Sequence, residues 1–185
     1  MINDIMASHE ERMQKTLEAL KKEFASLRAG RATPALLDKV AVDYYGTPTP
    51  VNQVAKISVP EPRMIVIQPW EKPMLHEIEK ALMKSDLGLT PNSDGAAIRL
   101  TIPQLTQERR EELKKSINKK AEDAKVALRN LRRDANDAIK KLEKAKSITE
   151  DESKKGQEDA QKLVDKYVKL VDTAKTAKEK EVMEI

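Results

Sequence analysis

The chain has 185 residues, of which 36% are charged and only 3% are aromatic, and its formal net charge is +4. This length suits one large domain or two small ones, and the composition favours long, solvated helices over a thick globular core. The chain contains no cysteine, which excludes disulfides and thiolate chemistry. We expect no signal peptide and no membrane span, and therefore a soluble cytosolic protein that does not act on a membrane.

The N-terminal flank predicts a helix with one apolar seam. Apolar residues recur there every seven residues, at Met6, Met13, Leu20 and Leu27, and the interleaved Leu17 and Phe24 give alternating spacings of four and three from Met13 onward. The pattern stops at Ala29-Gly30, where glycine is a typical signal for the end of a helix.

The middle segment has a different composition, because all nine prolines lie between Pro34 and Pro103. Short strands are predicted at 39–45, 54–59, 64–67 and 98–102, with Gly46-Thr47-Pro48 as a turn. A helix opens at Pro73 and ends near Lys84, and 91–95 is dense in turn-forming residues. Two roles stay open for Trp70, which follows a proline: an exposed contact and packing, of which we predict packing.

Two further helices follow the middle segment. The first runs from a Thr106 cap to about Lys146. Its seam comprises Leu113, Ile117, Ala121, Ala124, Leu128, Leu131, Ala135, Ala138 and Leu142. The last helix starts at a capping box formed by Thr149 and Glu152. Its seam is expected to comprise Ala160, Leu163, Tyr167, Leu170, Ala174 and Ala177.

Three helices that each have one apolar seam bury these seams by packing together as a bundle. We therefore predict an α+β protein, with an elongated antiparallel three-helix bundle from 1–30 and 106–185. A small β/α/β domain, 31–105, is inserted between the first and second helices. The two connecting segments predict a hinge between the domains. Its residues would be Gly30, Arg31, Pro103, Gln104 and Leu105.

Positive charge is concentrated on the second predicted long helix. Residues 106–146 carry fourteen basic and eight acidic side chains, a net +6 that exceeds the charge of the whole chain. Three arginines fall within five residues there, at Arg129, Arg132 and Arg133. Such a cluster favours a phosphate-rich partner, because a guanidinium offers a planar fork for phosphate oxygens and a flat face for bases.

The alternative for these arginines is a solvated helix face that pairs with acids such as Asp134 or Asp137. Lys125 and Lys140 could extend a nucleic-acid footprint. Arg28 and Arg31 flank the predicted elbow, where arginine also satisfies carbonyls at a helix end. They join the cluster only if the fold brings them near it.

The sequence lacks the motifs of common enzymes. The five glycines form neither a phosphate-binding loop nor a dinucleotide fingerprint, and no nucleophile motif is present. The only histidines, His9 and His76, are far apart and make a weak metal site. We therefore predict a non-enzyme that has no catalytic residue, cofactor or metal.

Five segments resemble signatures of bacterial ribosome recycling factors, in the order of that family. They are 28–32 (RAGRA), 44–50 (YYGTPTP), 85–89 (SDLGL), 91–93 (PNS) and 129–136 (RNLRRDAN). The resemblance implies an L-shaped molecule that has a bundle and a β/α/β arm. It also implies a function: binding the post-termination ribosome and splitting it into subunits with elongation factor G and GTP, which releases mRNA and deacylated tRNA.

On this resemblance, the basic helix would bind ribosomal RNA of the large subunit. Arg132 would be the main contact, supported by Arg129, Arg133, Arg28 and Arg31, and the protein would act as a monomer. Two other classes stay open from the residues alone: a helical adaptor or holdase for protein clients, and a general RNA-binding protein. The low aromatic content argues against the stacking readout that many RNA-binding domains use.

Overall fold

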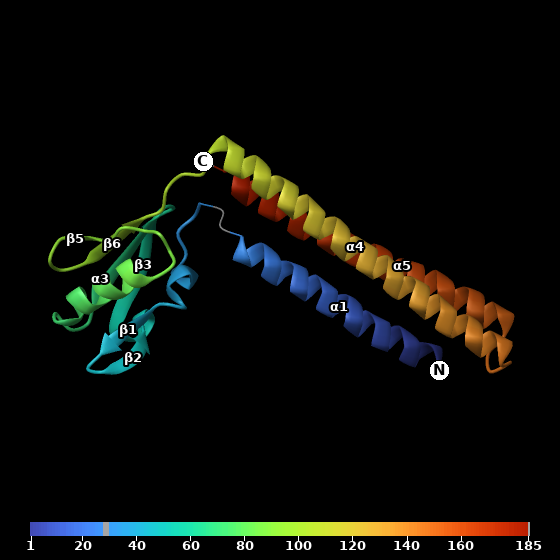
Figure 1. Cartoon of the computed structure of the whole chain (residues 1–185). Coiled ribbons are helices and arrows are strands. Elements are labelled where there is room, and N and C mark those ends of the chain that lie inside the picture. The colour runs from blue at the N-terminus through green and yellow to red at the C-terminus, as the bar shows by residue number, and fades with distance from the viewer. Residues whose placement is uncertain (28–29, 185) are drawn as a thin grey trace. The chain divides into compact units, whose positions relative to one another are not determined.

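The computed structural model describes residues 1–27 and 30–184. The chain divides into two compact units, Met1–Arg28 with Thr106–Ile185, and Ala29–Leu105 (Figure 1). Among the described residues, the first unit contains three long helices, and the second contains short strands and short helices. The predicted α+β class, with a three-helix bundle and a small mixed unit, is confirmed.

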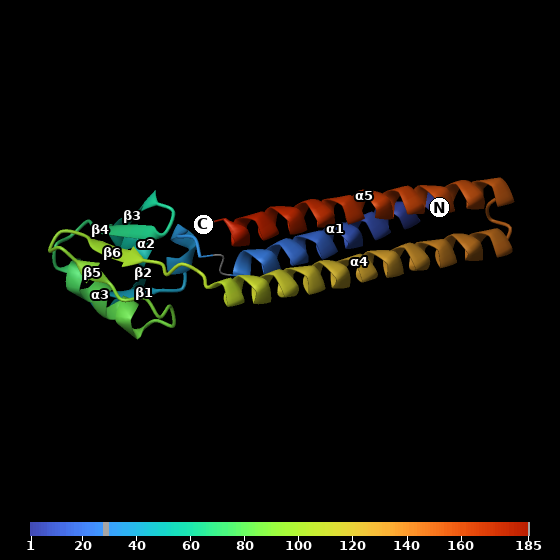
Figure 2. The same cartoon turned by 90° about the horizontal axis from the view of Figure 1, so that it is seen from above.

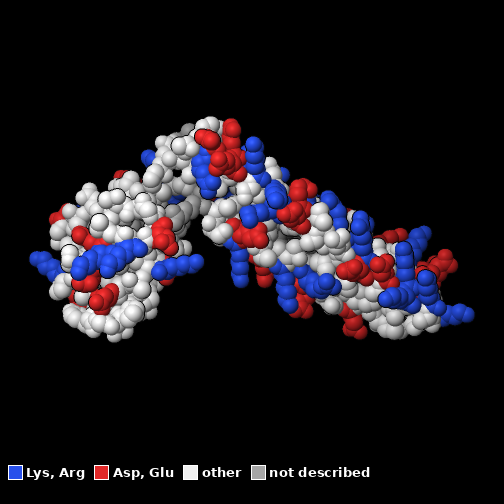
Figure 3. Space-filling model, in the orientation of Figure 1, with Lys and Arg blue, Asp and Glu red and all other residues white. Residues whose placement is uncertain are grey.

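The bundle is formed by α1 (Ile2–Ser26), α4 (Gln107–Lys144) and α5 (Glu150–Met183), which lie side by side in both views (Figures 1 and 2). The N-terminus lies at the same end of the bundle as the turn between α4 and α5. Neighbours along the chain are therefore antiparallel, while α1 and α5 run in the same direction. Charged side chains of both signs cover the bundle face shown in Figure 3.

The starts of the two longer helices follow the predicted caps. The Thr106 hydroxyl accepts a hydrogen bond from the Arg109 backbone N–H at 3.1 Å. Thr149 and Glu152 form a complete capping box, with hydrogen bonds of 3.1 and 2.9 Å. These bonds satisfy backbone N–H groups that have no partner within the helix.

The first helix ends earlier than its glycine predicts. It stops at Ser26, and the prediction of an end at Ala29-Gly30 is wrong. Its last turn contains no basic residue, but Lys178 of α5, which is buried, donates from Nζ to the Leu27 carbonyl at 3.1 Å. A cation from another helix thus stabilises the negative end of the α1 dipole.

The predicted seam of the last helix is correct at Ala160 and Tyr167, which are buried, and wrong at its other positions. Leu163 is only half-buried and Leu170 is 38% exposed, whereas the valines that follow them, Val164 and Val171, are buried. The observed seam comprises Ser153, Gly156, Ala160, Val164, Tyr167, Val171, Lys178 and Val182. Adjacent Leu-Val pairs fit either phase of a heptad pattern, so periodicity alone does not choose between them.

A similar correction applies near the end of α4. The seam continues from Ala135 to Ile139, which is fully buried, rather than to the half-buried Ala138. At this end the three helices meet closely. A Cβ atom on Gly156 would lie 3.2 Å from Ile139 Cδ1 and 3.4 Å from Ile2 Cγ2. Glycine therefore allows all three helices to approach one another at the tip.

The second unit contains six strands and three short helices. The strands are β1 (Ala41–Tyr44), β2 (Thr47–Pro50), β3 (Ala55–Glu61), β4 (Met64–Pro69), β5 (Asn92–Ser93) and β6 (Ile98–Thr101). The helices are the 3-10 helix η1 (Pro34–Leu37) and the α-helices α2 (Val51–Val54) and α3 (Met74–Lys84). A four-stranded antiparallel sheet has the order β3-β4-β6-β5, and β1 and β2 form a separate hairpin. Alternate strand residues, including Ile65, Ile67, Ile98 and Leu100, join Ile78 and Leu82 of α3 in one core.

The hairpin corrects a predicted turn. Thr47 and Pro48 belong to β2, and the turn itself is Tyr45-Gly46, whose φ values are +50° and +88°. Two consecutive positive φ values are typical of a two-residue hairpin turn of type I′. Prolines lack a backbone donor, so they are tolerated in β2 because this strand lies at an edge.

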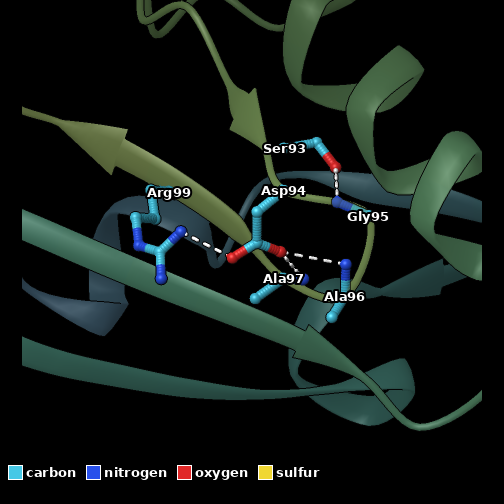
Figure 4. Close-up of polar contacts among 6 residues, drawn as sticks. All are labelled: Ser93, Asp94, Gly95, Ala96, Ala97 and Arg99. Carbon is cyan, nitrogen blue, oxygen red and sulfur yellow. Dashed lines mark hydrogen bonds and ion pairs between the residues drawn. The ribbon is translucent and has the colours of Figure 1, made fainter.

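The loop between β5 and β6 is organised by one carboxylate. Asp94 accepts hydrogen bonds from the backbone N–H groups of Ala96 (2.9 Å) and Ala97 (2.8 Å), and from Arg99 Nη1 at 2.7 Å (Figure 4). The two backbone N–H groups, followed by the guanidinium, lower the pKa of Asp94 to about 2 from an ordinary value of 3.8. The ionised form therefore stabilises this loop.

Replacing Asp94 with asparagine is expected to destabilise the second unit at neutral pH. A carboxylate with a lowered folded-state pKa contributes stability above its ordinary pKa, and this contribution is lost as the pH falls from about 4 to about 2. The gap between wild type and Asp94→Asn should therefore close over that interval in thermal unfolding scans. The exposed Asp86→Asn is the matched control, and an equal loss there at neutral pH would contradict this account.

Candidate nucleic-acid interface

The three clustered arginines lie on the outer side of α4. Leu128 and Leu131 are buried in the bundle seam and fix the rotation of this helix. With that rotation Arg129 and Arg133 are exposed and Arg132 is half-buried. Residues three and four apart are neighbours on a helix surface, so the three guanidinium groups share one side of α4.

Arg132 is held in place by the neighbouring helix. Its Nη1 donates to the side-chain oxygen of Gln161 on α5 at 2.5 Å, and the Gln161 amide donates in turn to Asp165 at 2.9 Å. Arg132 Nε is buried and has no hydrogen-bond partner within the described part of the chain. The guanidinium is therefore oriented by α5 and retains an unused donor.

The other two arginines are available to a ligand. Among residues 1–27 and 30–184, Arg129 and Arg133 take part in no salt bridge or side-chain hydrogen bond. The predicted alternative, pairing with Asp134 or Asp137, is therefore absent from these residues. An exposed guanidinium group without a partner binds a phosphate oxygen without first breaking an ion pair. Its binding therefore costs less free energy than that of a paired group.

Lys125 does not extend this surface. Its side chain is only 13% exposed, and its Nζ lies 2.6 Å from Asp172 Oδ1 on α5 and 3.6 Å from Glu122. The hydrogen bond with Asp172 is the main reason why the pKa of Lys125 is raised. Lys125 therefore links α4 to α5, whereas Lys140 is exposed.

A second group of predicted contacts comprises the two arginines at the predicted elbow, Arg28 and Arg31. Arg28 lies outside the described residues, and Arg31 is exposed in the second unit. The arginine cluster on α4 comprises Arg129, Arg132 and Arg133. Sequence reasoning missed Gln161, which orients Arg132, because no local signal marks a residue whose role depends on the register between two helices.

Backbone hydrogen bonds hold the second unit close to both of its ends. In the second unit, Ala32 N–H donates to the Pro62 carbonyl and Ile102 N–H to the Arg63 carbonyl, both at 2.8 Å. Gly30 has φ +74°, and a Cβ atom there would lie 3.0 Å from Leu105 Cγ. Regular hydrogen bonding in the bundle stops at Ser26 and resumes at Gln107. The linkers are therefore short, and glycine is required by the backbone at Gly30.

Residues 1–27 and 30–184 hold no group of three or more His, Asp or Glu side chains that could bind a metal ion. Among the same residues, none of the helices has the length and apolarity needed to cross a membrane.

Comparisons with known proteins agree along the whole chain. The family model of the ribosome recycling factor matches residues 20–183. The ribosome-recycling factor of Carboxydothermus hydrogenoformans is 63% identical over 185 residues, which is 100% of both chains. A solution structure of a ribosome recycling factor is 43% identical, with a TM-score of 0.75 over 100% of this chain and 98% of that one.

A second solved structure describes the T. thermophilus ribosome recycling factor and E. coli elongation factor G bound to the E. coli post-termination complex. It is 42% identical to this chain, with a TM-score of 0.64 and complete coverage of both chains. The family match, the sequence identity and the structural likeness all lead to the same assignment. This chain belongs to the ribosome recycling factor family.

Proposed function

We propose that this chain recycles ribosomes in the cytoplasm after translation has terminated. It binds the post-termination ribosome on large-subunit ribosomal RNA and, with elongation factor G and GTP, splits it into subunits. Messenger RNA and deacylated tRNA are then released. The family membership and the post-termination complex of a relative support this role. The chain itself would act without catalysis, because GTP hydrolysis would belong to elongation factor G.

The single observation that carries the RNA contact is the arginine cluster on α4. Arg132 is oriented by Gln161, and Arg129 and Arg133 have no partner within the described residues. Arg28 and Arg31 would add contacts from the elbow. Contacts of this type go mainly to phosphates, so they position the protein and make its affinity fall as the salt concentration rises.

The two units would move relative to each other about a hinge. Backbone hydrogen bonds hold the second unit from Ala32 to Ile102, and the bundle resumes at Gln107. We place the hinge between these hydrogen-bonded parts, at Gly30 and Arg31 in one connection and at Pro103, Gln104 and Leu105 in the other. The rigid bundle would hold the RNA while elongation factor G moves the second unit, 31–105, which breaks contacts between the ribosomal subunits.

Gly30→Ala is expected to slow splitting severalfold while binding to large subunits is retained. The substitution strains a backbone with φ +74° and places a Cβ atom 3.0 Å from Leu105. Gly95→Ala is the matched control, because Gly95 has φ +90° but nothing within 4 Å of its added Cβ atom. Stopped-flow splitting measures both, and an equal rate for the two variants would contradict the hinge.

Sucrose-gradient analysis of purified post-termination ribosomes tests the function itself. The proposal predicts free subunits only when this protein, elongation factor G and GTP are all present. Binding to large subunits should weaken with salt and should exceed binding to an unrelated structured RNA. Intact ribosomes in the complete mixture would contradict recycling, and equal affinity for any RNA would indicate a general RNA-binding protein.

A further inference from the structure

The aromatic residues of this chain are few and unevenly placed. There are one Trp, three Tyr and one Phe in 185 residues. Phe24 and Tyr167 are buried in the bundle. The other three, Tyr44, Tyr45 and Trp70, all belong to the second unit, and the side chains of Tyr45 and Trp70 are 69% and 67% exposed. The predicted packing role of Trp70 is therefore wrong.

A hydrogen bond joins the tip of the β1–β2 hairpin to the segment that follows β4, which contains Trp70 and Glu71. The Tyr45 hydroxyl, at the tip of the β1–β2 hairpin, donates to Glu71 Oε2 at 3.3 Å, and Glu71 directly follows Trp70. The rings of Tyr44 and Tyr45 meet edge to face, with centroids 4.8 Å apart. The charge of Glu71 is also the main reason why the pKa of both phenols is raised. We call Tyr44, Tyr45, Trp70 and Glu71 the aromatic surface.

The backbone at Tyr45 is unusual for an aromatic residue. Its φ of +50° is the first of the two positive values in the hairpin turn, a position where asparagine or aspartate is normally preferred. The Tyr45 side chain is exposed and is not part of the core of this unit, and its contacts are with Tyr44 and Glu71. A left-handed tyrosine at an exposed tip is therefore better explained by a contact with another molecule than by the stability of this fold.

The chemistry of the surface indicates which kind of molecule that is. Glu71 is exposed and takes part in no salt bridge within residues 1–27 and 30–184. A carboxylate beside a phenol ring, with an exposed indole on the preceding residue, offers a guanidinium or ammonium group a charged partner and the faces of aromatic rings. RNA is disfavoured, because residues 31–105 carry equal numbers of basic and acidic side chains and have no arginine cluster.

We propose that the aromatic surface binds a basic side chain, and the apolar surface around it, on elongation factor G. This inference rests on the proposed function, which assigns the bundle to RNA and leaves the second unit for the protein partner. Exposed tryptophan and tyrosine are the residues that most often dominate protein interfaces. The surface is thus the point at which elongation factor G acts on the second unit.

The test titrates elongation factor G into the splitting reaction with the double variant Tyr45→Ala/Trp70→Ala. The concentration needed for half-maximal splitting is expected to rise roughly tenfold, while binding to large subunits and thermal stability stay unchanged. Met83→Ala is the matched control, because it removes another large side chain, 73% exposed, at the far end of α3. Glu71→Gln should raise the same concentration about two- to fivefold.

Several results would overturn the inference. These are an unchanged requirement for elongation factor G in the double variant, an equal rise in Met83→Ala, or an unchanged requirement in Glu71→Gln. Loss of large-subunit binding in the double variant would show that the surface contacts RNA instead. Failure of the wild-type protein to split ribosomes would contradict the proposed function itself, and it would be seen before any variant is compared.

Discussion

Replacing Arg132 with alanine is expected to weaken binding to large ribosomal subunits by about 10- to 100-fold. A hydrogen bond to a charged group contributes about 1.5–3 kcal/mol, and about 1.4 kcal/mol corresponds to a factor of ten in affinity. Arg132 is the one arginine of the cluster whose guanidinium is oriented in advance, by Gln161 at 2.5 Å. Less conformational freedom is therefore lost when it binds a phosphate.

Salt dependence separates this effect from a loss of folding. Each lost phosphate contact lowers the slope of log affinity against log salt by about 0.7–0.9. The variant should therefore show a weaker affinity and a shallower slope. Lys119→Ala is the matched control, since Lys119 is an exposed cation on the same helix. The same loss in both variants would indicate general charge rather than a specific contact.

Replacing Leu128 with alanine is expected to destabilise the bundle by about 2–5 kcal/mol. Leu128 is fully buried in the α4 seam, and truncating a buried leucine loses its transfer free energy and leaves a cavity. Urea unfolding, followed by the helical circular dichroism signal, measures the change in the free energy of unfolding.

Leu170→Ala is the control that tests the corrected phase of α5. Leu170 is 38% exposed, so its removal should cost less than about 1 kcal/mol. The sequence alone predicts the opposite, because it places Leu170 in the seam. A loss at Leu170 as large as that at Leu128 would contradict the observed packing.

The helices were predictable because their signals are local. The caps at Thr106 and Thr149 each involve residues three apart, and both are present. The rotation of α5 was not predictable, because the Leu163-Val164 pair and the Leu170-Val171 pair fit two seams equally well. Packing against α1 and α4 selects the valines, and only the assembled bundle contains that information.

The candidate site, too, was predictable only where its signals are local in the sequence. Composition alone picked out Arg129, Arg132 and Arg133, and the structure places all three on one side of α4. Composition could not show that Asp172 engages Lys125 or that Gln161 orients Arg132, because both contacts depend on the register between α4 and α5. The exposure of Trp70 likewise depends on the path of the chain between β4 and α3, which the residue type alone does not determine.

The most direct test of the central claim is light scattering of post-termination ribosomes mixed with this protein, elongation factor G and GTP. We expect a fall in scattering that requires all three components. We also expect that the fall is lost when Arg129, Arg132 and Arg133 are all replaced by alanine, in a protein that remains folded. The same fall with the triple variant would contradict the claim that the α4 arginines hold the ribosome during splitting.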